Sequence, residues 1–334
     1  MFAIVKGAGA VGARVARQLH ATEGLERMLI VDEDRARAEA VAVALGAPAV
    51  AGPLTPDVMA AADVVVLSTP SPHRADAEAA LEHGVHVVST ADDLAGVRAL
   101  LELDAEARER GLTVAVGCGF SPGLACVLVR HGAAGFDVVD EIHVAQAGTG
   151  GPACARAHHR TLATDALDWR DGAWRPRPGG SGRELCWFPD PVAGRDCYRA
   201  GLPHALLLVP AFPGVSRVTA RMAATRRDRL TSWLPMLRRP HVEGGIGAVR
   251  VEVRGRRGTT TDTQVLGAID RPAVGAGVVA ALTATWAAEG QFTRPGAAGL
   301  ATLLDDPVPF LRELARRGVR AAAFEGAGVA ADRR

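Results

Sequence analysis

The stretch GAGAVG, from Gly7 to Gly12, has a glycine spacing that suits a pyrophosphate. It follows an apolar, strand-like run and opens a helical pattern. In this arrangement the first glycine permits a tight turn, the second lets the backbone approach a pyrophosphate, and the third lets helix and strand pack closely. Asp32 lies twenty positions after Gly12, at the end of the next strand-like run, where a carboxylate accepts hydrogen bonds from ribose hydroxyls. The stretch therefore predicts a dinucleotide site.

The dinucleotide is expected to be NAD or NADP, and Asp32 favours NAD because a carboxylate repels the 2′-phosphate of NADP. Arg35 and Arg37 could instead pair with such a phosphate, or they could be solvated charges on the second helix. Two further strand ends, 68–72 (STPSP) and 89–93 (STADD), should face the same crevice, because ligands of open α/β sheets bind beyond the carboxyl ends of the strands. The predicted cofactor-binding residues are Gly7, Gly9, Ala10, Val11, Gly12, Asp32, Arg35, Ser68, Thr69, Pro70, Ser89 and Thr90.

The loop GCGFSPG, residues 117–123, is a second candidate for chemistry. Ser121 and Pro122 have the pattern of an N-cap and a first helical turn, whose free N–H groups would bind a substrate carboxylate. Cys118 could act as a nucleophile, since a thiolate near a helix N-terminus is activated, or it could only fill space between glycines. We expect the loop to line the crevice as a hinge between domains.

The segment CARAHHRTL, residues 154–162, carries two adjacent histidines. On a helix, His158 and His159 point about a hundred degrees apart. One of them could donate a proton near neutral pH, or both could be solvated on a surface helix. Cys154 shares a face with His158, but two ligands do not make a metal site, so no metal is predicted.

Two arginines and a tyrosine complete the polar candidates. Arg160 and Arg183 could clamp a carboxylate, and Tyr198 could donate a hydrogen bond or be a half-buried sheet residue. The predicted catalytic residues are His158, His159 and Ser121. The predicted substrate-binding residues are Cys118, Gly119, Phe120, Pro122, Gly123, Arg160, Arg183 and Tyr198.

Alternating strand and helix patterns must position these residues. The apolar runs FAIVKG, MLIVD, APAV, DVVVLS, HVVST and TVAVG are unbroken rather than alternating, which suits a parallel sheet buried on both faces. Helical patterns lie between them. The fold expected over residues 1–120 is therefore an α/β Rossmann domain with a doubly wound parallel sheet.

The pattern changes from about Asp140 onward. In the run GAVRVEVRG, apolar and polar residues alternate, so that Val249, Val251 and Val253 lie on one face. This pattern is typical of an antiparallel strand with one solvent-exposed face. Helices are expected around 153–167 and 272–288. The prediction is a second α/β domain with a mixed or antiparallel sheet over 121–290, followed by a C-terminal helical segment, 291–334.

Together, GAGAVG, Asp32 and GCGFSPGLACVLVRHGA resemble the saccharopine dehydrogenase-like oxidoreductases, with VDEIHVAQAGTGG as the first strand of the second domain. The resemblance covers roughly the first half of the chain well. It implies a Rossmann domain, an α/β substrate domain, NAD(P), and interconversion of an imine and a secondary amine built from amino acids or polyamines. Saccharopine-forming reductases tend to carry an acid before the Pro-Gly, where this chain has Ser121, so saccharopine itself is not the expected substrate.

Composition excludes several classes of protein. A net charge of +1 with 22% charged residues lacks the excess of basic residues that is typical of proteins that bind nucleic acid or a membrane surface. Lys6 is the only lysine and Tyr198 the only tyrosine, which rules out a Tyr-x-x-x-Lys pair. Five cysteines without metal-type spacing indicate a reducing compartment, and a cytoplasmic location is expected. The helix over 272–288 could pack against its copy in a homodimer, or lie inside one chain.

The sequence thus predicts a two-domain NAD(P)-dependent oxidoreductase that acts on an imine, secondary amine or carbonyl of a small amino-acid-derived carboxylate. A Cys118-dependent semialdehyde dehydrogenase and a non-catalytic NAD(P)-sensing protein remain alternatives, because fold does not dictate function. A sugar oxidoreductase of the same architecture is disfavoured, since its Glu-Lys-Pro at the fifth strand is replaced by STADD.

Overall fold

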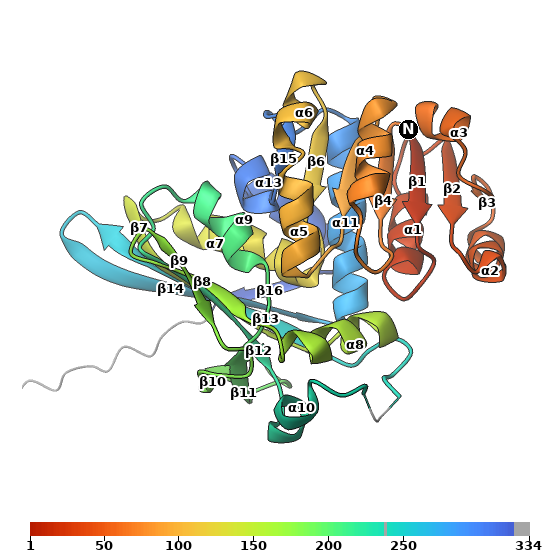
Figure 1. Cartoon of the computed structure of the whole chain (residues 1–334). Coiled ribbons are helices and arrows are strands. Elements are labelled where there is room, and N and C mark those ends of the chain that lie inside the picture. Colours follow the sequence, from red (N-terminus) through yellow and green to blue (C-terminus); the bar gives the residue numbers. More distant parts are fainter. Residues whose placement is uncertain (237–238, 324–334) are drawn as a thin grey trace, which may run out of the picture.

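The computed structural model describes residues 1–236 and 239–323, which form two sheets and the helices that cover them (Figure 1). Sheet A holds seven strands in the order β15-β6-β5-β4-β1-β2-β3, all paired in parallel. The strands are β1 (Phe2–Lys6), β2 (Arg27–Val31), β3 (Ala49–Ala51), β4 (Val64–Leu67), β5 (His86–Ser89), β6 (Thr113–Val116) and β15 (Gly296–Ala298). The six strands predicted for a Rossmann domain are confirmed.

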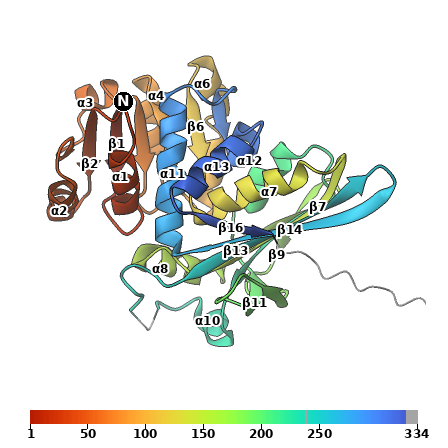
Figure 2. The same ribbon diagram turned by 180° about the vertical axis from the view of Figure 1, so that it is seen from behind.

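Helices cover both faces of sheet A, which explains why its strands are continuously apolar. Figure 1 shows α4 and α5 in front of the sheet, and Figure 2, seen from behind, shows α1 and α11 on the other face. The helices of this domain are α1 (Gly12–His20), α2 (Arg35–Leu45), α3 (Pro56–Ala60), α4 (Arg74–Glu82), α5 (Leu94–Leu101), α6 (Asp104–Glu109) and α11 (Pro272–Ala288).

Helix α11 lies inside the chain rather than on its surface. It is apolar all round and packs against α1, β4 and β5. At Gly277 an added Cβ would lie 2.5 Å from Cβ of Arg14, so the glycine lets the two helices touch. Because α11 is covered by its own chain, it is not a surface through which two copies could pair. Among the described residues, no helix has the length and apolar character needed to cross a membrane.

Sheet B is mixed, and it contains the predicted alternating strand. β7 pairs in parallel with β12 and antiparallel with β13, which pairs antiparallel with β14. Val249, Val251 and Val253 of β13 are fully buried, on the side that packs on α7. The strands are β7 (Val138–Ala147), β8 (Ala166–Arg170), β9 (Ala173–Arg177), β10 (Glu184–Trp187), β11 (Gly194–Arg199), β12 (Arg217–Ala223), β13 (Gly247–Arg257), β14 (Thr260–Asp270) and β16 (Arg320–Ala323).

The remaining helices show where the sequence-based boundaries differ from the structure. They are α7 (Ala125–Ala133), α8 (Pro152–Thr161), α9 (His204–Leu208), α10 (Arg226–Thr231), α12 (Leu300–Leu303) and α13 (Val308–Arg316). Helix α8 ends before residue 167, because Ala166 already begins β8. The segment 291–323 contains helices, as predicted, but it also adds β15 to sheet A and β16 to sheet B. Residues 324–334 lie outside the described residues.

Candidate functional site

Two glycines of the loop between β1 and α1 pack tightly against the neighbouring strands. The Gly7 N–H donates to the Val31 carbonyl over 2.7 Å, which ties the loop to β2. A Cβ on Gly12 would lie 1.7 Å from the Gly7 oxygen and 2.5 Å from Oγ of Ser68. No side chain fits at Gly12, because helix α1 starts directly against the end of β1.

The same loop is open on the side where a pyrophosphate would bind. A Cβ on Gly9 would meet nothing within 4 Å. Among the described residues, no backbone carbonyl accepts a hydrogen bond from the N–H groups of Ala10, Val11 or Gly12. Unpaired N–H groups at a helix start attract phosphate oxygens. The loop therefore fits the pyrophosphate of a dinucleotide.

Asp32 stands beside this loop, as the sequence predicts. Its carboxylate accepts hydrogen bonds from the Ala8 N–H at 2.6 Å and from the Asp34 N–H at 2.9 Å. Arg37 lies 3.6 Å from the carboxylate. Arg35 is 87% exposed and pairs with Glu39, so its side chain is engaged on the surface of α2. The arrangement leaves a carboxylate, rather than a free arginine, beside the loop between β1 and α1.

The hydroxyls at the next strand ends bond within the protein. Oγ of Ser68 donates to the carbonyls of Lys6 and Gly7, and Oγ1 of Thr90 donates to the Leu67 carbonyl. Ser89 is fully buried against His73, and Thr69 also contacts that imidazole ring. Pro70 is exposed. These residues hold the carboxyl ends of β1, β4 and β5 together.

The loop over 117–124 is buried, so the N-cap interpretation of Ser121 was wrong, whereas packing is the alternative that holds for Cys118. Ser121 is not an N-cap, because the residues that follow it are not helical: Pro122 has a ψ of −174°, and α7 begins only at Ala125. Gly123 follows with a φ of +105°, a conformation that interrupts any helix at this point. Cys118 is fully buried, and burial raises the pKa of its thiol, so it is not an activated nucleophile.

Packing explains the rest of this loop. The Phe120 ring lies against α11, where a Cβ on Gly275 would meet the ring at 2.6 Å. At Gly119 an added Cβ would lie 3.4 Å from the Pro122 carbonyl oxygen. The loop thus folds onto itself and onto α11.

Ser121 instead forms a buried pair with a histidine of α9. Its Oγ lies 2.8 Å from Nε2 of His204, and no polar atom among the described residues contacts Nδ1 of that ring. Burial, followed by the charge of His158, lowers the pKa of His204 to about 3. His204 is therefore neutral at ordinary pH.

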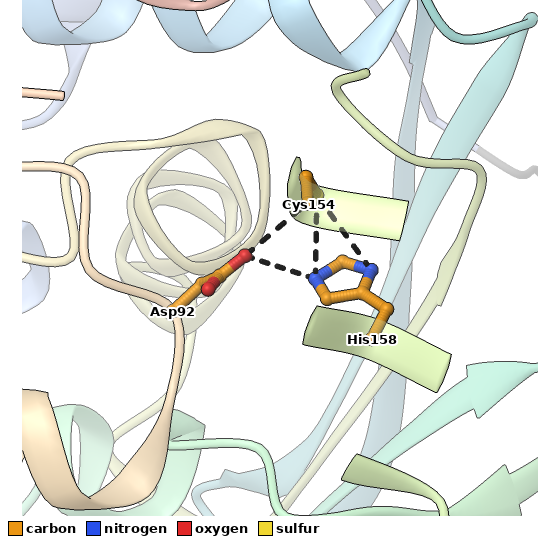
Figure 3. A group of neighbouring side chains, drawn as sticks. All are labelled: Asp92, Cys154 and His158. Atoms are coloured by element: carbon orange, nitrogen blue, oxygen red, sulfur yellow. Dashed lines mark hydrogen bonds and ion pairs between the residues drawn. The ribbon is translucent and has the colours of Figure 1, made fainter. Parts of the chain in front are cut away.

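Helix α8 and the end of β5 bring together Asp92, Cys154 and His158 (Figure 3). Nε2 of His158 lies 2.9 Å from Oδ2 of Asp92 and 3.7 Å from Sγ of Cys154, and Sγ lies 3.8 Å from the same Oδ2. Burial by itself would lower the pKa of His158, but Cys154 and the Asp92 carboxylate raise it well above its ordinary value. The cluster can hold a proton or a cation.

Helix α8 lies across the carboxyl edge of sheet A (Figure 1). The loop that precedes it touches the pyrophosphate loop, since a Cβ on Gly151 would lie 2.7 Å from Cβ of Ala10. Asp92 follows β5, whereas Cys154 and His158 follow β7. Helix α8, which follows a strand of sheet B, therefore brings His158 to the edge of sheet A where the loop between β1 and α1 lies.

The other predicted polar residues do not join this cluster. Nε2 of His159 contacts the Thr231 carbonyl at 2.9 Å, on the side of α10. Arg160 is exposed, and Arg183 is an exposed partner of Asp196. Tyr198 is buried beneath Arg229, so it is a core residue of sheet B.

Three residues of the site, Asp92, Cys154 and His204, are absent from the predicted site residues, although Cys154 was seen to share a helix face with His158. Asp92 lies in the STADD stretch at a strand end, which was a usable signal, but its partner is 66 positions away. His204 lies in an apolar helix without a motif, 83 positions from Ser121. Two surface hollows of about 420 and 430 Å³ lie elsewhere, beside Phe212 and Pro213. Converging side chains, rather than a cavity, define the candidate site.

Comparison with known protein families gives a match over residues 2–118, to the model described as an oxidoreductase family with an NAD-binding Rossmann fold. These residues contain six of the seven strands of sheet A, all but β15, together with the open loop between β1 and α1. The N-terminal part of the chain is therefore an NAD(P)-binding Rossmann domain of the oxidoreductase type.

Comparison with solved structures extends the likeness to the whole fold. Saccharopine dehydrogenase (L-Glu forming) from Saccharomyces cerevisiae matches with a TM-score of 0.71 and 15% identity, over 97% of this chain and all (100%) of that one. Amine dehydrogenase from Mycobacterium smegmatis matches with a TM-score of 0.52 and 14% identity, over 91% of this chain and 96% of that one. The predicted resemblance to saccharopine dehydrogenase-like proteins is confirmed in the fold.

Proposed function

We propose that this protein transfers a hydride between NAD(P) and an imine, secondary amine or carbonyl of a small amino-acid-derived carboxylate. One observation carries the proposal: the open loop after β1 and the Asp92–Cys154–His158 cluster lie at one edge of sheet A. Only β4 separates β1 from β5, and neighbouring strands are about 4.8 Å apart, so the strands that lead to the loop and to Asp92 are about 10 Å apart across the sheet. A dinucleotide held at its pyrophosphate would reach the cluster with its nicotinamide end.

In this proposal some residues bind the cofactor, and others hold the proton that accompanies the hydride. The nicotinamide itself supplies or accepts the hydride. The N–H groups of Ala10 to Gly12 bind the pyrophosphate, and Asp32 binds the ribose hydroxyls, which favours NAD. His158 holds the proton that accompanies the hydride, since Asp92 fixes its ring and stabilises its protonated form.

The substrate class has independent support from the comparisons. The names of the two solved structures denote a saccharopine dehydrogenase and an amine dehydrogenase, and this chain shares their fold. A semialdehyde dehydrogenase that depends on Cys118 is not supported, because that thiol is buried in the core.

The test measures the rate of the reaction in both directions. In one direction, NADH or NADPH is oxidised with 2-oxo acids or aldehydes as substrates, with and without added amino acids. In the other direction, NAD or NADP is reduced with amino acids as substrates. Two variants separate the adjacent histidines. His158→Gln should lower kcat by roughly 10²–10⁴-fold, the contribution of a positioned acid or base. His159→Gln should leave kcat close to the wild-type value, since its ring faces Thr231.

The outcomes separate the candidate functions. Equal turnover by His158→Gln and the wild type would remove the proton role of His158. Tight cofactor binding without turnover of any member of the panel would favour the alternative of a non-catalytic NAD(P)-sensing protein.

A further inference from the structure

The donor atoms of Asp92, Cys154 and His158 point to one shared location. Each of the three distances among Oδ2, Sγ and Nε2 lies between 2.9 and 3.8 Å. The three residues form the one group of this kind in the described part of the chain in which at least three His, Cys, Asp or Glu side chains could hold a metal ion. Figure 3 shows the side chains directed inward from two separate segments.

This geometry differs from that of a nucleophilic triad. In a triad the histidine contacts the acid through one ring nitrogen and the nucleophile through the other. Here Nε2 is the atom nearest to both partners, at 2.9 Å from Asp92 and 3.7 Å from Cys154, whereas Nδ1 lies 3.9 Å from the sulfur. The three groups thus surround a point instead of forming a relay.

The separations match one face of a tetrahedral zinc site. Zinc binds sulfur at about 2.3 Å and nitrogen or oxygen at about 2.0–2.2 Å, so tetrahedral ligand atoms are separated by about 3.3–3.6 Å. The observed sulfur distances, 3.7 and 3.8 Å, are slightly longer, and the nitrogen–oxygen distance of 2.9 Å is slightly shorter. Shifts of a few tenths of an ångström would convert the cluster into a binding site.

The donor types select the cation. A thiolate and an imidazole suit Zn²⁺, whereas Mg²⁺ and Ca²⁺ prefer oxygen ligands alone. Asp92 and Cys154 are partly exposed, and only the His158 ring is buried, so a cation can enter from the side of the acid and the thiol. Three protein ligands leave one coordination position open, as in catalytic zinc sites.

We propose that Asp92, Cys154 and His158 bind one Zn²⁺ ion, with its fourth position open toward the edge of sheet A. Cys154 and His158 are spaced i, i+4 on helix α8, and Asp92 comes from the Rossmann domain, so the ion links the two domains. Binding releases the protons of the thiol and the imidazole. Zinc and the proton of His158 are therefore alternative occupants of one site.

The role of the ion at this site depends on the proposed function, although its binding does not. In the zinc-bound protein the open position accepts the lone pair of a substrate carbonyl oxygen or imine nitrogen. The ion then withdraws electron density from the carbon that receives the hydride. The hydride leaves the nicotinamide for that carbon, and because zinc-bound His158 has no proton to give, the product oxygen or nitrogen takes its proton from solvent water.

The test measures metal binding directly. Full-length protein is stripped with a chelator and titrated with Zn²⁺ by calorimetry, and with Co²⁺ by the absorption of cobalt–thiolate bonds. Wild type should bind one equivalent, with a rise in the thermal midpoint, because a ligand of the folded state stabilises it. Cys154→Ser should lose the thiolate absorption and at least tenfold in affinity, and His158→Gln should behave likewise.

His159→Gln is the matched control, because it removes the neighbouring histidine on the same helix and should keep wild-type binding. The proposal is overturned if wild type binds no Zn²⁺, or if Cys154→Ser and wild type bind it equally. Titration of the same samples with NADH separates the two ideas. Zinc binding without nicotinamide binding would refute the proposed function alone, and the reverse result would refute the zinc site alone.

Discussion

Replacing Gly9 by alanine should block the cofactor while leaving the fold intact. The new Cβ would meet no atom of the protein within 4 Å, so the free energy of unfolding should stay within about 1 kcal/mol of wild type. The methyl group would occupy the space through which a pyrophosphate approaches. Loss of one or two hydrogen bonds to a charged group costs about 1.5–3 kcal/mol each.

Such a loss corresponds to an increase in the Kd for NADH of on the order of 100-fold. Gly12→Ala provides the contrast, because its Cβ would lie 1.7 Å from the Gly7 oxygen. We expect that variant to lose at least about 1–3 kcal/mol of stability, the usual cost of overpacking. Thermal unfolding measures the stability of both variants, and NADH fluorescence titration measures binding. Wild-type affinity in a well-folded Gly9→Ala protein would refute the assignment of this loop.

Two further predictions concern His73 and Asp32. Burial lowers the pKa of His73 in the folded protein, and the hydrogen bond to Thr69 is the largest opposing effect. As the pH falls below about 6.5, the unfolded chain therefore binds the proton before the folded protein does. The free energy of unfolding should decline from that pH down to the lower pKa of the folded state. In urea unfolding measured between pH 7 and 5, His73→Gln should reduce this decline in the free energy of unfolding. His83→Gln, which replaces an exposed histidine, should not. An equal decline in both variants would contradict the reasoning. Asp32→Asn removes the negative charge but keeps an oxygen that can accept the hydrogen bond from the Ala8 N–H. The ratio of kcat/KM for NADH to kcat/KM for NADPH should therefore fall by about tenfold or more, which corresponds to about 1.4 kcal/mol per tenfold. An unchanged ratio would show that Asp32 does not select the cofactor.

Most of the Rossmann domain could be predicted from the sequence, because its signals are local. The run VVVL of β4 is apolar at every position, and all four side chains are buried, as in a sheet covered on both faces. The glycine spacing and Asp32 act within about 25 residues of one another, so a single stretch contains the whole signal.

The errors arose where a local signal had a distant competitor. Ser121 and Pro122 have the composition of a helix start, but the Ser121 hydroxyl is held by His204 and Gly123 adopts a positive φ. For Cys118 the sequence left a nucleophile and a packed side chain as alternatives, and contact with α11, more than 150 residues away in the chain, decides for packing. Although Gly123 is a neighbour of Ser121, His204 and α11 lie far outside any short sequence window.

The amino-acid sequence alone determined the elements of the first domain and the open amide loop that suits a dinucleotide, since backbone geometry and apolar periodicity are properties of neighbouring residues. Only the tertiary structure decided which polar side chains meet. Asp92 and His158 are 66 positions apart, and they come together because β5 and α8 are carried to the same edge by two different sheets. Long-range pairing of this kind depends on how whole elements pack, which no single stretch of the chain encodes.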